Sequence, residues 1–208
     1  MTVRELYKKR HDASLNRLAG GIEGLIREYL RGVPRIDRIG ARAKSIDRFV
    51  AKSEKLGDDG KLKYSDPLNQ IQDQVGARII AFYLCDVPIV SEIVEQYFRP
   101  VESRALIPEK ESEFGYVGKH YILLTPADVL EDDMDHADIP EFFELQIKTL
   151  YQHAWSEAGH DLAYKPGEEP LTTDEKRMMA FTAAQSWGAD RILDELFRKR
   201  AQQPNPGQ

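Results

Sequence analysis

The chain has 208 residues, of which 41% are hydrophobic and 31% charged, and its net charge is −6, a composition typical of a globular protein and not of a disordered one. No apolar run approaches eighteen residues and the charged start does not resemble a secretory signal, so we expect no transmembrane helix and no leader. The single cysteine, Cys85, can form no internal disulfide, and a buried reduced thiol fits the cytoplasmic location that we expect.

The charge is distributed unevenly along the chain. Residues 1–65 contain 16 Lys and Arg against 9 Asp and Glu, whereas residues 66–208 contain 13 against 26. A basic first part beside an acidic second part suits a protein that holds an anionic ligand and a cation, although solvated helix faces produce the same pattern.

The first predicted elements are helical. Apolar residues recur at helical spacing between Leu15 and Tyr29, which predicts a long N-terminal helix that ends near Gly32 and Pro34. A second helix is predicted to begin after Ser45, because a serine side chain can cap the first free N–H groups of a helix.

The middle of the chain predicts strands. Residues 77–84 are apolar except for Arg78, which is typical of a buried strand. Asp86 is expected to cap the next helix. Residues 100–108 are expected to be extended, and residues 121–125 to form a further strand before a proline.

The last part predicts a strand over residues 142–147, followed directly by a helix over residues 149–161. Thr172 and Glu175 form a capping-box pattern, which predicts a final helix that runs to about residue 199. The expected order is α-α-β-α-β-β-β-α-α, and it predicts an α+β protein with a mixed sheet flanked by N-terminal and C-terminal helices.

The strand over 142–147 carries the strongest functional signal. Because side chains alternate along a strand, Phe143, Leu145 and Ile147 should face the core. Glu144 and Gln146 should then lie side by side on the opposite face. A carboxylate and an amide in that position suit a metal ion or a polar substrate better than plain solvent.

Asp73 has two interpretations. An arginine inside an apolar strand needs a partner, because an unpaired buried charge is costly, so a structural Asp73–Arg78 ion pair is one of them. In the other, Asp73 and Glu144 lie on neighbouring strands as two oxygen ligands of Mg²⁺, which takes its remaining ligands from phosphate oxygens.

Two further segments carry groups suited to an anionic ligand. Arg42, Lys44 and Ser45 lie where the second helix is expected to begin, and a helix N-terminus with cationic side chains attracts phosphate. The glycine-flanked loop over 115–120 presents Tyr116, which could stack on a base, together with Lys119 and His120.

His153 and His160 lie seven residues apart on one predicted helix face, and Asp161 follows the second of them. This spacing would be compatible with a phosphohydrolase metal site of the His-Asp type. We reject that hypothesis because the further metal-ligand motif that such a domain needs is missing.

In their order along the chain, these motifs resemble the synthetase domain of the RelA/SpoT family over roughly residues 40–165. The resemblance is carried by Arg42-x-Lys44-Ser45, Asp73-x-x-Gly76-x-Arg78-Ile79, Gly115-Tyr116-x-x-x-His120, and Glu144-x-Gln146-Ile147-x-Thr149 with His153-Ala154-Trp155. We therefore expect an N-terminal helix over 1–35, a synthetase domain over 36–165, a C-terminal helix over 166–200 and a disordered tail over 201–208.

The resemblance implies a nucleotidyltransferase-like fold and a synthesis-only enzyme without a hydrolase domain. Family members transfer the β,γ-pyrophosphate of ATP to the 3′-hydroxyl of GDP or GTP, which makes the alarmone (p)ppGpp and AMP. The resemblance also implies ATP-binding roles for four residues. The adenine would lie between Arg42 and Arg78, and Lys44 and Ser45 would contact the phosphates. The resemblance further implies that Asp73 and Glu144 hold Mg²⁺ and that Glu144 is the candidate base.

The resemblance places the acceptor nucleotide at a third group of residues: Tyr116, Lys119, His120, Gln146 and Lys148. Two departures from the family pattern leave the acceptor open. The loop reads Gly-Tyr-Val-Gly-Lys-His where many members have Gly-Tyr-Arg-Ser before an apolar residue and the histidine, and Lys148 stands where arginine is usual.

Three alternatives to a guanine alarmone synthetase follow. Some toxic small relatives use adenine nucleotides or the 3′ end of tRNA as acceptor, and the basic stretch up to residue 63 would suit tRNA phosphates. A non-catalytic nucleotide-binding module is less expected, because a degenerate site tends to lose its carboxylates. A scaffold that acts through its helices is the third, and small family members often form homo-oligomers.

Overall fold

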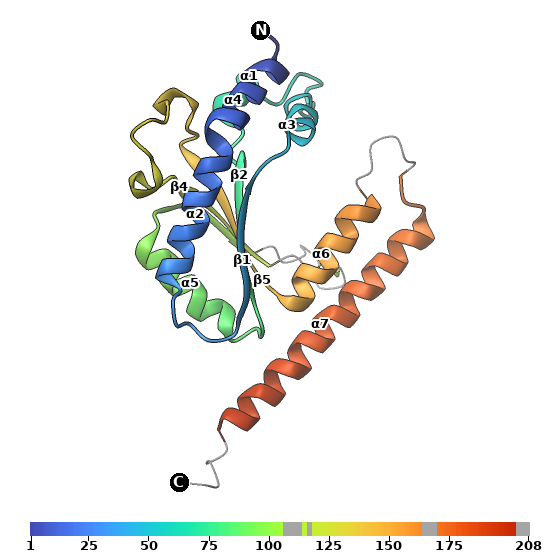
Figure 1. Ribbon diagram of the computed structural model, residues 1–208. Helices are drawn as coiled ribbons and strands as arrows, with labels where there is room; N and C mark the ends of the chain where they lie inside the picture. The colour runs from blue at the N-terminus through green and yellow to red at the C-terminus, as the bar shows by residue number, and fades with distance from the viewer. Residues whose placement is uncertain (106–113, 116–117, 164–169, 203–208) are drawn as a thin grey trace.

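The structure is a computed structural model that describes residues 1–105, 114–115, 118–163 and 170–202. A five-stranded mixed sheet forms its centre, with α2 and α5 on one side and the pair α6 and α7 on the other (Figure 1). This arrangement confirms the expected α+β class, a mixed sheet flanked by helices from both ends of the chain.

The N-terminal helix begins well before Leu15, where the apolar pattern starts, and has three parts. It comprises α1 (Val3–Arg10), one π-helical turn (His11–Leu15) and α2 (Asn16–Tyr29). It ends near Gly32, where a φ of +83° suits a residue without a side chain. The predicted end of this helix is therefore confirmed.

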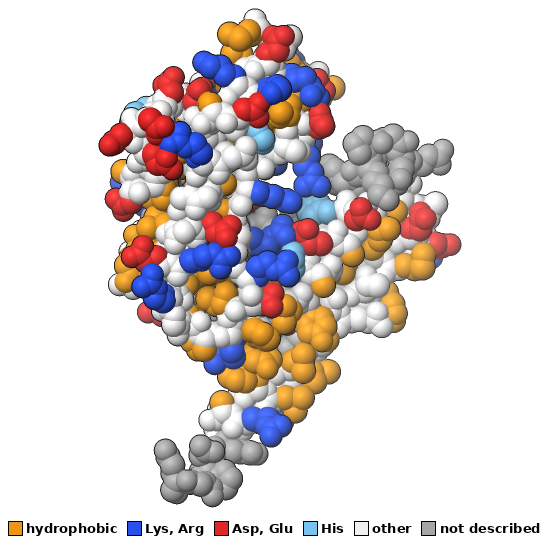
Figure 2. All heavy atoms as spheres, viewed as in Figure 1, with side chains coloured by type: hydrophobic (Ala, Val, Ile, Leu, Met, Phe, Trp, Pro, Cys, Tyr) orange, Lys and Arg blue, Asp and Glu red, His pale blue; other side chains and the backbone are white. Residues whose placement is uncertain are grey.

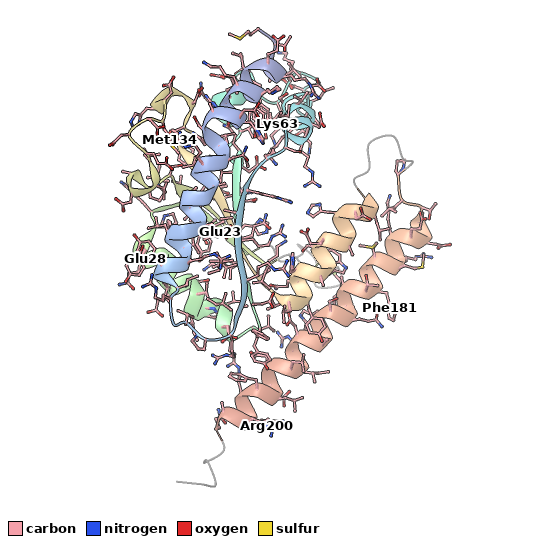
Figure 3. All side chains as sticks on the ribbon, in the orientation of Figure 1. Glu23, Glu28, Lys63, Met134, Phe181 and Arg200 are labelled. Carbon is pink, nitrogen blue, oxygen red and sulfur yellow. The ribbon has the colours of Figure 1, made fainter. Side chains whose placement is uncertain are left out.

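Strand β1 (Ile36–Ala43) was missed by the sequence analysis, which expected Arg42 at the start of a helix. Arg42 instead lies on this edge strand, and α3 (Ile46–Ser53) begins after it. Ser45 is the N-cap residue of α3, but its side chain makes no capping hydrogen bond. Glu23 of α2 holds the strand, since its Oε2 accepts the Ala41 N–H at 2.9 Å (Figure 3).

The sheet has the strand order β1-β2-β5-β4-β3. Strands β2 and β5 run parallel, whereas the β1–β2, β4–β5 and β3–β4 pairs are antiparallel. The bounds of the remaining elements are α4 (Pro67–Gln70), β2 (Val75–Ala81), α5 (Asp86–Tyr97), β3 (Pro100–Ala105), β4 (Lys119–Leu124), β5 (Phe142–Thr149), α6 (Leu150–Ala163) and α7 (Thr173–Ala201), with short 3₁₀ turns at Ala127–Val129 and His136–Asp138.

Two sequence predictions around β2 were wrong in detail. The strand ends at Ala81 instead of residue 84, because the chain turns there toward α5. Asp86 does not cap α5: its carboxylate accepts the Tyr83 N–H at 3.2 Å and pairs with Arg35 at 2.7 Å, so it closes the turn before the helix. The expected extended segment forms β3 up to Ala105, and its residues 106–108 lie outside the described residues.

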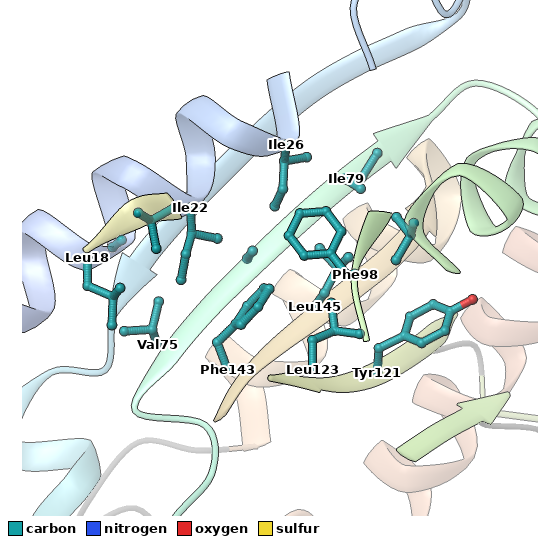
Figure 4. Close-up of a cluster of buried hydrophobic side chains, with 14 of the residues drawn as sticks. Leu18, Ile22, Ile26, Val75, Ile79, Phe98, Tyr121, Leu123, Phe143 and Leu145 are labelled. Carbon is teal, nitrogen blue, oxygen red and sulfur yellow. The ribbon is translucent and has the colours of Figure 1, made fainter. Parts of the chain in front are cut away.

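The core lies between the sheet and the helices α2 and α5 (Figure 4). Phe143, Leu145 and Ile147 of β5 have no exposed surface, as their alternation predicted. They pack with buried residues of α2 such as Leu18 and Ile22. Burying each large apolar side chain contributes about 1.5–3 kcal/mol. This packing fixes β5 and therefore the direction of the side chains on its other face.

The helix α7 begins with the predicted capping box, in which the Thr172 side chain accepts the Glu175 N–H and the Glu175 carboxylate accepts the Thr172 N–H. The residues from 203 of the expected disordered tail lie outside the described residues. In the described ranges, no helix combines the length and the apolar character that crossing a membrane requires.

Candidate active site

A cavity of about 790 Å³ opens on the face of the sheet opposite the core. Figure 2 shows lysine, arginine and histidine side chains around a hollow between the sheet and α6. The charged and polar residues that line it come from β1, α3, the start of β2, β4, β5 and α6: Arg38, Arg42, Lys44, Ser45, Arg48, Asp73, Arg78, His120, Glu144, Gln146, His153, Glu157, His160 and Asp161.

The register of the sheet explains how these side chains meet. Gly76 of β2 lies between Arg42 of β1 and Glu144 of β5, so that the three residues form one row across the sheet. Apart from its two neighbours in the chain, no described residue has an atom within 4 Å of the position that a Cβ of Gly76 would occupy. The floor of the cavity is therefore open between a guanidinium and a carboxylate. A second row joins Arg78, Gln146 and His120.

Asp73 precedes β2 and is held by two lysines. Lys44 Nζ and Lys52 Nζ each lie 2.9 Å from its Oδ2, while its Oδ1 is buried and has no hydrogen-bond partner among the described residues. Burial raises the pKa of Asp73, but the charges of Lys44 and Lys52 outweigh it and the pKa is lowered. Of the two interpretations of Asp73, the structural ion pair with Arg78 is therefore wrong, because two lysines from other elements reach the carboxylate instead.

Glu144 is the second carboxylate of the cavity. His120 Nδ1 lies 3.2 Å from its Oε1, and Gln146 Nε2 donates to its Oε2 at 2.8 Å. Burial raises the pKa of Glu144, whereas His120 and Gln146 lower it, and the net pKa lies below the usual range. Two polar atoms beside it, His120 Nε2 and Gln146 Oε1, are buried without a partner in the described part of the chain.

The donor set fits a magnesium ion that a substrate helps to hold. Asp73 and Glu144 line the same cavity. The described residues contain no group of three or more His, Cys, Asp or Glu side chains suited to a metal. Mg²⁺ keeps several waters and is commonly bound by one or two carboxylates together with substrate phosphates, so two carboxylates and an unpartnered Oδ1 match it.

Arg78 is oriented from α6. Its Nη1 pairs with Glu157 Oε1 at 2.8 Å and lies 3.3 Å from His153 Nδ1. Burial raises the pKa of Glu157, but the charge of Arg78 outweighs it and the pKa is lowered, so the pair is ionised. The guanidinium is thereby held as a fixed plane on the cavity wall, and such a plane can stack on an aromatic base.

The comparison with known proteins decides the family. The family model described as "Region found in RelA / SpoT proteins" matches residues 41–169. The chain belongs to the RelA/SpoT family. It is 33% identical over 135 residues to GTP pyrophosphokinase YjbM of Bacillus subtilis (strain 168), a match over 62% of this chain and 57% of YjbM. The chain thus matches only somewhat more than half the length of this curated relative.

Solved structures share the fold. Small alarmone synthetase 1 from Bacillus subtilis, bound to its product pppGpp, superposes with a TM-score of 0.69 at 22% identity, over 96% of this chain and 98% of that one. The protein smu.1046c from Streptococcus mutans UA159 gives a TM-score of 0.65 at 26% identity, over 88% and 90% of the two chains. The flanking helices therefore belong to the shared fold as well as residues 41–169.

Most of the predicted site residues line the cavity, but two of those that the structure describes lie outside it. Lys119 Nζ pairs with Glu95 at 3.0 Å and lies over the Tyr121 ring, and it is not among the described lining residues. Lys148 is 1% exposed and also absent from the lining. Burial, with the charge of Arg78 next in size, lowers the pKa of Lys148 to about 8. Tyr116 lies outside the described residues.

The sequence analysis missed several lining residues. Arg38 and Arg48 carry no motif that separates them from solvated surface arginines. Glu157 was also missed, although it lies four residues from His153, which belongs to the motif resemblance, and four from Asp161, so that the three face the cavity together. That helical spacing was the available signal, and the rejected phosphohydrolase hypothesis had drawn attention to two of the histidines on this face without Glu157.

Proposed function

We propose that this protein transfers the β,γ-pyrophosphate of ATP to the 3′-hydroxyl of GDP or GTP and so makes (p)ppGpp and AMP. The observation that carries the proposal is a pair of ionised carboxylates, Asp73 and Glu144, in one cavity with five Lys and Arg side chains. A polyphosphate donor needs cationic surroundings, and its metal needs carboxylates. The names of the relatives, a GTP pyrophosphokinase and a synthetase with bound pppGpp, support the same reaction.

The chemistry matches what the residues can do. The acceptor 3′-oxygen forms a bond to the β-phosphorus of ATP, the bond from that phosphorus to the α–β bridging oxygen breaks, and AMP leaves. Glu144 is ionised and is the group proposed to accept the proton of the 3′-hydroxyl. Phosphoryl transfer depends mainly on alignment and charge neutralisation, and Lys44 and Arg42 can supply both at the phosphates and the base.

Magnesium is proposed as the cofactor, held by Asp73 and Glu144. When bound, Mg²⁺ would neutralise phosphate charge and lower the pKa of the attacking hydroxyl. Arg42 and Arg78 are proposed to hold the adenine, with Ser45 near the phosphates. His120 and Gln146 are proposed to bind the acceptor, since each has a buried polar atom without a partner in the described residues.

The test is a transfer assay with ATP labelled in its β- and γ-phosphates. The protein and Mg²⁺ are incubated separately with GDP, GTP, ADP and deacylated tRNA, and the products are separated by chromatography. We expect label on GDP or GTP and release of AMP. Label on tRNA or ADP but not on guanine nucleotides would show that the acceptor is not GDP or GTP. ATP binding without transfer to any acceptor would favour a non-catalytic module.

A further inference from the structure

A buried polar network joins the helix α1 to the two segments that carry Lys44 and Asp73. Tyr7 has no exposed surface, and its hydroxyl donates to the Lys44 carbonyl at 2.8 Å. Its ring stacks on Phe49 of α3 with centroids 3.6 Å apart and planes within 2°. The hydroxyl is thus held at one place on the backbone that leads from β1 to α3.

Arg10 lies one turn after Tyr7 on the same face of the helix and is 7% exposed. Its Nη1 donates to the Leu68 carbonyl at 2.7 Å and to Gln74 Oε1 at 3.2 Å, and its Nη2 donates to the Ala137 carbonyl at 3.2 Å. Asp138 is the nearest acid, with 3.9 Å between Arg10 Nε and its Oδ1. The guanidinium therefore joins three segments of the chain through hydrogen bonds to the Leu68 and Ala137 carbonyls and to the Gln74 side chain. The ion pair with Asp138 is longer than these hydrogen bonds.

Gln74 links the hydrogen bonds of Arg10 to the backbone of Lys44, which Tyr7 also contacts. It is 1% exposed, and its Nε2 donates to the carbonyls of Leu68 at 2.8 Å and Ile71 at 3.0 Å. The backbone carbonyl of Gln74 accepts the Lys44 N–H at 2.8 Å. Lys44 is therefore held at its N–H by Gln74 and at its carbonyl by Tyr7, while Asp73 is the residue directly before Gln74.

The network lies behind the carboxylate. Lys44 and Lys52 both pair with Asp73 Oδ2, and the Lys44 carbonyl accepts the Tyr7 hydroxyl, so Lys44 joins the carboxylate to the phenol. Asp73 Oδ1 remains buried without a partner among the described residues. The orientation of the Asp73 carboxylate depends on the backbone around Gln74 and Lys44, which Arg10, Gln74 and Tyr7 hold through their hydrogen bonds.

We propose that Tyr7 and Arg10 are positioning residues, which fix the backbone of Asp73 and Lys44 and so orient the Asp73 carboxylate at the cavity that Asp73 and Lys44 line. Tyr7 and Arg10 both lie outside residues 41–169, the part of the chain that the family model matches. The inference rests on the proposed function in that Asp73 takes part in binding Mg²⁺ with ATP. A π-helical turn directly follows Arg10, and such turns often occur at functional sites.

The first test is Tyr7→Phe, which keeps the stacked ring and removes one donor. Binding of a non-hydrolysable ATP analogue is measured by calorimetry over a series of Mg²⁺ concentrations and without Mg²⁺. We expect the half-saturating Mg²⁺ concentration to rise about ten-fold, as for other groups that orient a metal ligand, with Mg²⁺-free binding unchanged. The matched control is Tyr29→Phe, whose ring stacks on Tyr97 at 4.2 Å, and it should leave the midpoint unchanged.

The second variant is Arg10→Lys, which retains the positive charge but has one terminal nitrogen in place of two, whereas Arg10 reaches Leu68 and Gln74 from Nη1 and Ala137 from Nη2. It should raise the Mg²⁺ midpoint in the same way, whereas Arg17→Lys, on the same N-terminal helix and paired with Asp133, should not. Wild-type Mg²⁺ midpoints in both Tyr7→Phe and Arg10→Lys, or an equal loss of Mg²⁺-free binding, would overturn the inference.

The readout also separates the inference from the proposed function. A shift of the Mg²⁺ midpoint in a protein that transfers no pyrophosphate would contradict the proposed reaction and support the positioning role. Normal transfer with unshifted Mg²⁺ midpoints in the variants would support the proposed reaction and contradict the positioning role. A wild-type protein whose binding of the analogue does not depend on Mg²⁺ would overturn the inference, whereas the transfer assay alone decides the proposed reaction.

Discussion

Glu144 is a partly buried carboxylate kept ionised by a histidine and an amide. In Glu144→Gln, the new amide can neither accept the proton of the 3′-hydroxyl nor supply the charge that a metal needs. We expect the transfer rate to fall at least about 100-fold, the usual contribution of a general base, with ATP binding roughly intact. The measurement is label transfer together with analogue binding.

The matched control is Glu141→Gln, which changes an exposed carboxylate just before the same strand and should leave transfer unchanged. Turnover at the wild-type rate in Glu144→Gln would remove Glu144 from the mechanism. Loss of ATP binding together with transfer would instead assign it to the donor site.

Lys148 gives a prediction about stability and pH. Burial, and after it the charge of Arg78, lowers its pKa from 10.5 to about 8, so the folded chain holds fewer protons than the unfolded chain between these two values. The free energy of unfolding should therefore rise as the pH increases from about 8 to 10.5, and the full penalty of a buried ammonium applies below about pH 8. Lys148→Met should be more stable than wild type at pH 7, with the difference shrinking toward pH 10.

Urea unfolding at a series of pH values measures this difference. Lys9→Met, which replaces an exposed lysine of α1, is the control and should show the wild-type pH profile. A constant difference between Lys148→Met and wild type from pH 7 to 10 would show that the Lys148 ammonium is not desolvated in the fold.

At the scale of residues, the sequence predicted which side chains line the cavity better than it predicted their ion-pair partners. The alternation on β5 correctly separated Glu144 and Gln146 from the core, because the period of a strand is local information. The partners of Asp73 were not predictable, since Lys44 and Lys52 reach it from elements that approach only in the folded chain. The roles of these residues in binding remain predictions.

At the scale of elements, the strand β1 was the main omission. Its sequence, Ile-Asp-Arg-Ile-Gly-Ala-Arg-Ala, has no clear alternation of apolar and polar residues. An edge strand needs only one partner, and here one face packs against α2 while the other lines the cavity with arginines. Such a strand lacks the continuous apolar run that made β2 recognisable.

The junction between β5 and α6 carries a capping box that also joins α7. The Gln152 N–H donates to Thr149 Oγ1 at 3.1 Å, and Gln152 Oε1 accepts the Thr149 N–H at 2.9 Å. The Thr149 hydroxyl in turn donates to Asp190 of α7, and both residues are buried. One hydroxyl thus links the end of the strand that bears Glu144 to two helices.

We expect Thr149→Val to lower the free energy of unfolding by about 2 kcal/mol, because it removes a cap and leaves the buried Asp190 carboxylate without that donor. Thermal or urea unfolding measures it. Thr173→Val, at an exposed position at the start of α7, is the control and should change stability by less than about 0.5 kcal/mol. Equal stability of the two variants would mean that the Thr149 links are dispensable.

At the scale of the molecule, the uneven charge of the sequence has a structural counterpart. Among the described residues that line the cavity, four of the five lysines and arginines come from residues 1–65 and the four carboxylates come from residues 66–208. The basic and acidic parts of the chain therefore meet at one site. Neither part alone would offer both phosphate-binding cations and metal-binding carboxylates.

The helix α7 carries large apolar side chains that remain exposed: Met178, Phe181, Ile192 and Leu196 (Phe181 in Figure 3). We expect the protein to form a homo-oligomer through this helix, because burying such a surface is favourable. Size-exclusion chromatography with light scattering should give a mass that is a multiple of 23.8 kDa.

Phe181→Glu and Ile192→Glu should each shift the protein toward the single-chain mass, because each would bury a charge in the interface. Lys176→Glu, which changes an exposed charge on the same helix, is the control and should leave the mass unchanged. A wild-type mass of 23.8 kDa at micromolar concentration would contradict the expected assembly.

The parallel pairing of β2 with β5 also has a consequence for how the chain folds. A parallel pair cannot be closed by a hairpin, and here the connection between the two strands contains α5, β3 and β4. Asp73 and Glu144 thus meet only after a contact of high sequence separation has formed, which is a slow step in folding. A nascent chain that has emerged as far as β4 carries Asp73 without Glu144, so the complete carboxylate pair exists only once β5 has inserted between β2 and β4.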